Sequence, residues 1–125
     1  MLVFAAISGF LAVAMGAFGA HGLKSVLTPE MLTVYQTGVF YHLTHSIIWV
    51  VVALAAVQWP SISWLNRSAW AFALGIVLFS GSLYLLTLTG IKTLGMVTPF
   101  GGVSLLVGWF MLAMAGKSLV KVKAD

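Results

Sequence analysis

Residues 68–91 read SAWAFALGIVLFSGSLYLLTLTGI, a run without a single charged side chain. A helix needs about 20 mainly apolar residues to cross the hydrocarbon core of a bilayer, which is about 30 Å thick. The apolar residues in this run are continuous instead of alternating with polar ones, which favours a helix over a strand of a membrane barrel. The stretch therefore predicts a transmembrane helix.

Three other uncharged stretches share these properties. They cover residues 1–23, 31–66 and 93–116, and each is long enough for one crossing but too short for two crossings with a turn. We therefore expect an all-α membrane protein, a four-transmembrane-helix bundle that forms one domain over residues 1–125. Its spans are predicted near residues 2–20, 40–57, 69–88 and 98–115.

The composition agrees with this fold class. Of the 125 residues, 62% are hydrophobic, 6% are charged and none is cysteine, whereas soluble domains carry about 25% charged residues. These values exclude a water-soluble globule, a disulfide scaffold and a disordered tail. The net charge is +4, but the six Lys and Arg residues are spread along the chain and form no basic stripe. We therefore expect no nucleic-acid partner, and interpret the positive charge as a topology signal.

The second uncharged stretch is longer than one crossing requires. It is preceded by Thr28-Pro29-Glu30, which is typical of a helix N-cap, a proline in the first turn and an acid near the helix N-terminus. A helix from residue 29 to residue 57 would be about 43 Å long at 1.5 Å per residue. Either it projects into water, or a short interfacial helix over residues 29–37 bends at Gly38 before the crossing. We favour the bend.

The distribution of Lys and Arg predicts the orientation. Four spans place both termini on the side of the Arg67 loop, with Lys24 and Lys92 on the opposite side. The first side carries more positive charge, so the positive-inside rule places both termini in the cytoplasm. A cleaved signal peptide is the alternative for residues 2–20, but the apolar run is long and no Lys or Arg precedes it.

Small residues recur on the predicted helices. They allow close backbone approach, which helix association in lipid requires because apolar faces supply no driving force there. The packing candidates are Ser8, Ala12, Gly16, Ala20, Gly81, Gly101, Gly102 and Gly108. Packing within one four-helix bundle is the favoured role, and self-association or docking onto a partner is the alternative. The spacing itself does not distinguish contacts within the chain from contacts between chains.

Chemically active residues are few. No Asp or Glu lies within a predicted span, whereas proton-coupled transporters usually carry such acids at mid-membrane. The sequence also lacks nucleotide-binding loops, zinc-protease motifs and serine-nucleophile motifs. The histidines are His21, His42 and His45, and imidazole can bind metal or haem iron. Packing and hydrogen bonding are the favoured roles, so we expect no enzyme and no cofactor, with His21 and His45 as the candidate metal ligands.

A second group of polar residues gathers toward the predicted non-cytoplasmic side. Hydroxyl groups within helices usually bond the carbonyl of the preceding turn. Alternatively, converging polar groups in one leaflet would line a ligand cavity together with the histidines. The candidates for this site are His21, His45, Tyr41, Ser80, Ser82, Tyr84 and Thr98.

Several motifs together resemble one family. The chain carries GAFGAHGL at residues 16–23, Thr37-Gly38-Val39 with Tyr41 and His45, FSGSLY at residues 79–84, TPFGG at residues 98–102 and Gly108-Trp109. In this order, and over nearly the whole chain, the motifs resemble the YgdD-like family of small bacterial inner-membrane proteins. This is domain-of-unknown-function family 423, which includes eukaryotic transmembrane protein 256.

The resemblance implies a polytopic helical protein of the bacterial inner (plasma) membrane but supplies no activity. It also implies histidine at the positions of His21 and His45, and glutamine at the position of His42, which argues against a three-histidine metal site. We therefore expect a non-enzymatic packing or accessory protein that acts with membrane lipid, with itself as a homo-oligomer, or with a larger membrane complex. The alternative is a ligand-handling protein, a small transporter or a metal or haem site, that uses His21, His45 and residues 80–84.

Overall fold

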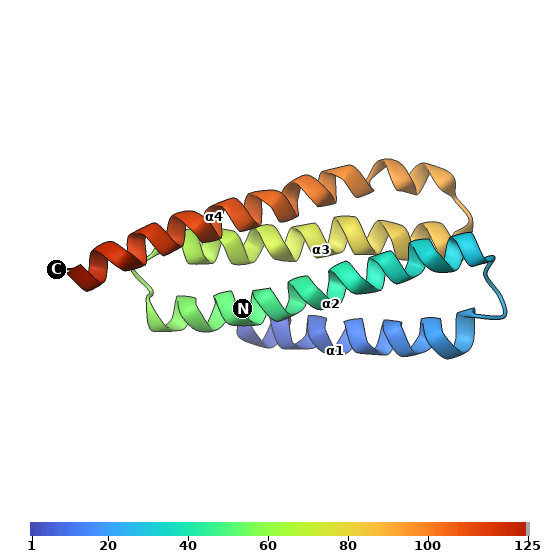
Figure 1. Cartoon of the computed structure of the whole chain (residues 1–125), viewed down its shortest axis with the longest axis horizontal. Coiled ribbons are helices and arrows are strands. Elements are labelled where there is room, and N and C mark those ends of the chain that lie inside the picture. The colour runs from blue at the N-terminus through green and yellow to red at the C-terminus, as the bar shows by residue number, and fades with distance from the viewer. Residues whose placement is uncertain (125) are drawn as a thin grey trace.

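The computed structural model describes the backbone of residues 1–124 and the side chains of residues 1–120. The described chain is helical, without strands, and its long helices lie side by side (Figure 1). The elements are α1 (Leu2–Phe18), the π-helical turn η1 (Gly19–Leu23), α2 (Pro29–Gln58), α3 (Ser63–Thr89), the 3₁₀ turn η2 (Lys92–Met96) and α4 (Thr98–Ala124). Four helices are long and apolar enough to cross a membrane, which confirms the predicted fold class.

The start of α2 and the end of α3 follow from local sequence. Thr28 caps α2, because its side chain accepts a hydrogen bond from the backbone N–H of Met31 over 3.3 Å. Pro29 and Glu30 occupy the first turn, as predicted. Gly90 ends α3 with a φ of 73°, a left-handed conformation that glycine adopts without a steric penalty.

The predicted bend at Gly38 is wrong. Helix α2 continues through Gly38 without interruption, and no separate interfacial helix precedes the span. A Cβ at Gly38 would lie 3.1 Å from a ring carbon of Tyr84 and 3.3 Å from the Cβ of Leu83. Glycine is therefore present because α3 approaches closely there, and not because the backbone turns.

The first helix buries Gly19 near its end, whereas the predicted packing residue Ala20 is exposed. The buried positions Ala5, Ser8, Ala12 and Gly19 follow the helical period of 3.6 residues. A strict four-residue spacing drifts away from that face and has left it at Ala20. The ring of Tyr35 occupies the space beside Gly19, with Cε1 only 2.5 Å from the position of a Gly19 Cβ.

Extensive helix contacts join helices that follow one another in the chain. Among the described residues, α3 packs most closely against α4 and then against α2, while α1 packs against α2. Figure 1 shows the same order across the molecule, with α2 between α1 and α3, and α3 between α2 and α4. The bundle is therefore an open row, which leaves a groove between α1 and α3 and another between α2 and α4.

Glycines bring α3 and α4 together. A Cβ at Gly101 would overlap the backbone of Phe79, and a Cβ at Gly75 would overlap the side chain of Leu105. At Gly108 it would lie 2.8 Å from the ring of Phe72. Of the other candidates, Gly102 has only ordinary contacts with Phe79, and Gly81 has no heavy atom within 4 Å.

The described side chains have the distribution expected in a membrane, with apolar groups on the surface and hydroxyl groups inside. Large apolar side chains such as Phe10, Val57 and Phe100 are more than 70% exposed, while Ser46 and Ser68 are fully buried. Such a surface suits hydrocarbon, and the buried hydroxyls bond across the helices. Lys121 and Lys123, which contribute to the predicted charge bias, lie outside the residues whose side chains are described.

Candidate functional site

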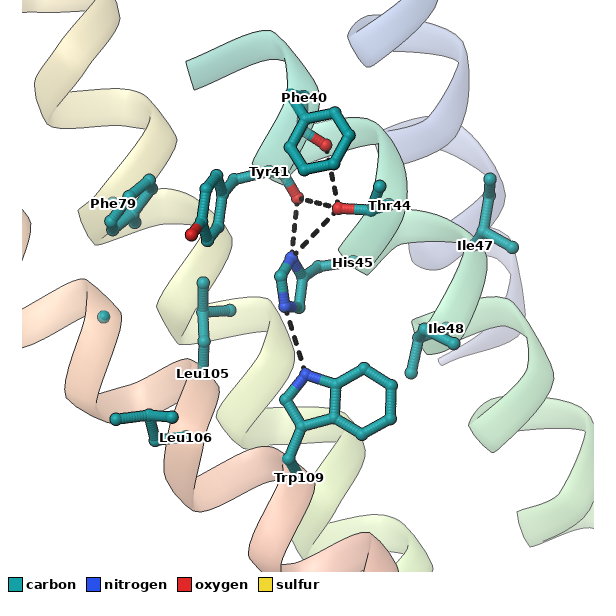
Figure 2. Close-up of a pocket in the computed structure, with 11 residues that line it drawn as sticks. Phe40, Tyr41, Thr44, His45, Ile47, Ile48, Phe79, Leu105, Leu106 and Trp109 are labelled. Atoms are coloured by element: carbon teal, nitrogen blue, oxygen red, sulfur yellow. Dashed lines mark hydrogen bonds between the residues drawn. The ribbon is translucent and has the colours of Figure 1, made fainter. Parts of the chain in front are cut away.

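The larger groove lies between α2 and α4 and has a volume of about 740 Å³. Its walls are residues 40–48 of α2 and residues 102–109 of α4, and Phe79 of α3 forms its floor. Figure 2 shows that aromatic and branched apolar side chains dominate the lining. We call it the α2–α4 groove.

His45 is the main polar side chain of the α2–α4 groove, and both of its ring nitrogens have partners. Nδ1 lies 2.8 Å from the backbone oxygen of Tyr41, so Nδ1–H donates to that carbonyl. The indole N–H of Trp109 donates to Nε2 over 3.3 Å (Figure 2). These partners select the neutral Nδ1–H tautomer. Because the Nε2 lone pair is already engaged, His45 would have to lose its bond to Trp109 before it bound a metal.

The second groove lies between α1 and α3 and has a volume of about 390 Å³. Its walls are residues 4–11 of α1 and residues 73–84 of α3, with His42 and Trp49 of α2 between them. We call it the α1–α3 groove. It shares no lining residue with the α2–α4 groove, so the two are separate sites.

A chain of hydrogen bonds runs along the α1–α3 groove. The Tyr84 hydroxyl lies 3.1 Å from His42 Nδ1, and His42 Nε2 lies 3.2 Å from the hydroxyl of Ser8. The Ser8 hydroxyl in turn lies 2.6 Å from that of Ser46. Each hydroxyl can donate or accept, so the chain can be oriented in either direction. It ties α1, α2 and α3 together through side chains.

Two further polar groups in the α1–α3 groove have no partner. Ser80 Oγ and Trp49 Nε1 are the buried side-chain atoms without a hydrogen bond in the described part of the chain. Ser80 is 1% exposed and Trp49 is 8% exposed. A buried polar group without a partner costs about 1–3 kcal/mol, so each of these two atoms lowers the stability of the fold.

The residues predicted to form one polar cavity lie in several places. Tyr41 and His45 line the α2–α4 groove, while Ser80 and Tyr84 line the α1–α3 groove. Ser82 and Thr98 share a 2.7 Å hydrogen bond that links α3 to the start of α4. His21 is exposed on η1 and lines neither groove.

Sequence reasoning passed over three residues of the α1–α3 groove and its hydrogen-bond chain: His42, Ser46 and Trp49. Their spacing of i, i+4 and i+7 marks a single helical face, which was the available signal. His42 was set aside because glutamine is expected at its position, although an amide can also hydrogen-bond on both sides. In the structure it contacts polar groups of both α1 and α3.

The described residues contain no cluster of three or more His, Cys, Asp or Glu side chains with the geometry of a metal site. His21 and His45 do not line a common groove, and no Asp or Glu lines either of the two grooves. The arrangement can hold apolar chains and accept or donate neutral hydrogen bonds.

Comparisons with known proteins give the family. The model of the family described as "Protein of unknown function (DUF423)" matches residues 15–102. The UPF0382 membrane protein YwdK of Bacillus subtilis is 44% identical over 91% of this chain and 93% of its own length. The UPF0382 inner membrane protein YgdD of Escherichia coli K12 is 46% identical over 90% of this chain and 85% of its own length. No solved structure matches the chain. The match over most of its length shows that this chain belongs to the DUF423 family of membrane proteins, whose function is not established.

Proposed function

We propose that this protein is a non-enzymatic accessory protein of the bacterial inner membrane that binds the hydrocarbon chain of a membrane lipid in the α2–α4 groove. The observation that carries the proposal is the groove itself, which is apolar, about 740 Å³ in volume and open at the side. A groove of this size and character is typical of small-molecule sites. In a membrane, the apolar molecules that surround it are lipids.

The lining favours a flexible chain over a partner helix. Helices associate in lipid where small residues allow their backbones to approach. The α2–α4 groove has bulky walls, including Phe40, Leu106 and Trp109, and Gly102 is its only glycine. The glycines between α3 and α4, Gly75, Gly101 and Gly108, already contact the neighbouring helix within the chain. Homo-oligomer formation through the small residues is therefore the weaker alternative.

Gly102 offers a direct way to test lipid binding. A Cβ there would be 3.8 Å from the nearest Phe79 atom, so a larger side chain can enter the groove without a backbone clash. We expect Gly102→Leu to reduce the lipid retained by the protein in native mass spectrometry after gentle extraction. Gly116→Leu is the matched control, because Gly116 is also on α4, has no neighbour within 4 Å and lies outside the groove.

The outcomes of that experiment are distinct. Lipid lost in Gly102→Leu but kept in Gly116→Leu supports the proposal. Equal lipid retention in both variants contradicts it. If the protein instead retains a bound protein subunit, and only Gly102→Leu loses it, the occupant of the groove is a partner helix and not a lipid.

We further propose that both termini face the cytoplasm. The support is the charge bias of the sequence, in which Arg67, Lys117, Lys121 and Lys123 fall on the side of the termini and only Lys24 and Lys92 on the other. The chain has no cysteine, so single cysteines can be introduced as labels. A membrane-impermeant maleimide applied to spheroplasts should label Ser25→Cys and spare Ser61→Cys; the reverse pattern would invert the orientation.

The ligand-handling alternative is favoured by a different observation, the unpartnered polar atoms Ser80 Oγ and Trp49 Nε1. They belong to the α1–α3 groove. Of the predicted site residues, Ser80 and Tyr84 are the ones that line this groove.

A further inference from the structure

A tryptophan lies across one end of the α2–α4 groove. Figure 2 shows the indole of Trp109 extending from α4 toward α2, where its N–H donates to His45 Nε2 over 3.3 Å. Trp109 is the last residue of α4 along the groove, and Ile48 is the last residue of α2. Because α2 and α4 are not neighbours in the row of helices (Figure 1), the indole closes a gap between them at this end.

The position of the indole depends on a few directed contacts. Its ring meets the ring of Phe72 edge to face, with centroids 5.5 Å apart and an interplanar angle of 80°. His45 is itself held by its bond to the Tyr41 carbonyl and by the nearly parallel ring of Tyr41 at 5.6 Å. Trp109 is 45% exposed, so packing does not enclose it. The hydrogen bond to His45 therefore decides where the indole lies.

Trp109 lies near the middle of the membrane. The uncharged part of α4 from Thr98 to Lys117 is about 28 Å long at 1.5 Å per residue, close to the thickness of the hydrocarbon core of about 30 Å. At the same rise, Trp109 is about 16 Å from the Thr98 end. The other end of the groove is lined by Phe40, which is exposed, and by Gly102, which has no side chain. The groove thus lies in the leaflet on the side of η2, and its closed end is close to the bilayer centre.

A Trp–His pair at this depth exceeds what packing requires. Tryptophan is enriched at the membrane interfaces, and polar groups inside the hydrocarbon core are costly unless they are paired. An aliphatic side chain would fill the same space without a polar atom. The N–H···N bond between Trp109 and His45 adds direction, because it fixes the orientation of the ring across the groove. The pair therefore supplies a wall at a fixed position.

Small residues follow beyond this wall. Gly116 lies two turns after Trp109 on the same face of α4, and a Cβ there would have no heavy atom within 4 Å. On α2, Ala55 lies two turns after Ile48. The indole thus separates the groove from a stretch with small side chains, and a hydrocarbon chain in the groove would have to pass the ring to continue.

From these observations we infer that Trp109 is the end wall of the α2–α4 groove and limits the length of the hydrocarbon chain that it binds. The chain belongs to a lipid of the leaflet on the side of η2, and its terminal methyl group contacts the indole. His45 is the positioning residue that holds the indole in place.

The dimensions of the groove set the preferred chain length. From Phe40 to Ile48 the groove is about 12 Å long, which is shorter than one leaflet of the hydrocarbon core at about 15 Å. The end wall therefore favours short chains. This inference rests on the proposed function, lipid binding in the α2–α4 groove, and adds to it a leaflet and a chain length.

The test measures the binding of single-chain lipids of graded length. Lysophosphatidylcholines from octanoyl to stearoyl are titrated onto the full-length protein in a mild detergent, and binding is measured by native mass spectrometry. Gly102→Leu fills the groove, so the binding that this substitution removes is the binding in the groove. We expect this part of the binding to rise with chain length and then to fall once the chain is longer than the groove.

Substitution of the end wall should shift this profile. Trp109→Ala should move the best-bound chain to a greater length and raise the affinity for the stearoyl lipid relative to the lauroyl lipid about threefold, the size of a few new van der Waals contacts. Trp109→Leu removes less volume and should give a smaller shift in the same direction. Trp70→Ala is the matched control, because Trp70 is exposed on α3 and lines neither groove. An equal shift in Trp70→Ala would contradict the end wall.

His45→Phe tests the positioning role. It keeps a ring at this place and removes the acceptor of the Trp109 N–H. We expect the groove to bind lipid still, but with a weaker preference among chain lengths, because the indole is no longer held across the gap. A length profile identical to that of the unsubstituted protein would show that the hydrogen bond does not position the indole.

The end wall and the proposed function fail in different ways. If Gly102→Leu binds every lipid as well as the unsubstituted protein does, lipid binding in the groove is wrong, and the end wall with it. If Gly102→Leu removes binding but both Trp109 variants keep the original length profile, the end wall is wrong and lipid binding stands.

Discussion

The two outer pairs of helices are held together in different ways. Helices α3 and α4 meet where Gly75, Gly101 and Gly108 leave no room for a side chain. Helices α1 and α2 are joined instead by side chains that cross the gap, including Ser8 to Ser46 and the Tyr35 hydroxyl to the Met15 carbonyl over 2.7 Å. The contact between α3 and α4 requires glycine, which has no side chain, whereas the contact between α1 and α2 requires particular polar side chains.

This difference predicts how each pair responds to substitution. Where two backbones touch, an added methyl group must push the helices apart, and many contacts are lost together. Where side chains bridge a gap, a substitution removes one bond and leaves the helices in place. The α3–α4 contact should therefore respond steeply to added volume, and the α1–α2 contact moderately to lost polar groups.

The largest effect is expected for Gly101→Val. The new side chain would overlap the backbone of Phe79, which cannot move aside as a flexible side chain can. We expect a loss of about 3 kcal/mol or more in the free energy of unfolding, measured by steric trapping in bicelles. Gly116→Val is the control, since Gly116 has no neighbour within 4 Å. A loss no larger than that of the control would remove the distinction between the two pairs.

Gly19→Ala should have the next largest effect. Its methyl carbon would lie 2.5 Å from a ring carbon of Tyr35, and this side chain can shift only partly because it is fully buried. We expect about 2 kcal/mol of destabilisation in the same assay. The double variant with Tyr35→Leu should recover part of this loss, because the two substitutions share one contact. Strictly additive effects would refute the contact.

Ser8→Ala tests the polar bridge between α1 and α2. It removes the partner of both His42 and Ser46. Hydrogen bonds between transmembrane helices contribute about 0.6 kcal/mol on average, so the loss of two should cost about 1 kcal/mol. Ser118→Ala is the comparison, because the Ser118 hydroxyl bonds only the carbonyl of Met114 in its own helix. Equal changes in the two variants would show that the bridge adds no stability.

The smallest effect is expected for Ser104→Ala. The Ser104 hydroxyl donates to the Ala71 carbonyl over 2.8 Å, within a contact that the glycines already hold. We expect about 0.6 kcal/mol, well below the effect of Gly101→Val in the same pair of helices. A cost above that of Ser8→Ala would mean that hydrogen bonds, and not close packing, hold α3 against α4.

The sequence was sufficient for the four spans because membrane helices need long uncharged stretches, and the helices of the structure occupy them. It was not sufficient for the role of individual glycines. Gly38 suggested a bend because glycine often weakens a helix. In the structure, Leu83 and Tyr84 of α3 pack where a side chain at Gly38 would lie. A contact between residues that are far apart in the sequence cannot be recognised from the residues around either one.

The candidate site was predictable only in parts for a related reason. Ser80 and Tyr84 were identified as polar groups within a span, but their grouping with His45 assumed that residues at one depth share one cavity. The open row of helices separates them into two grooves. Ala20 was expected on the packing face because a strict four-residue spacing was assumed, whereas the period of 3.6 residues per turn places Gly19 on the face of Ser8 and Ala12.

The open row has a consequence for biosynthesis. Since each extensive contact in the described chain joins a helix to its immediate neighbour in sequence, a helix that enters the membrane finds its partner already there. Domains generally form from the N-terminus during synthesis, and contacts between sequence neighbours need little loop closure. The order in which the ribosome delivers the helices is also the order in which they lie in the finished protein.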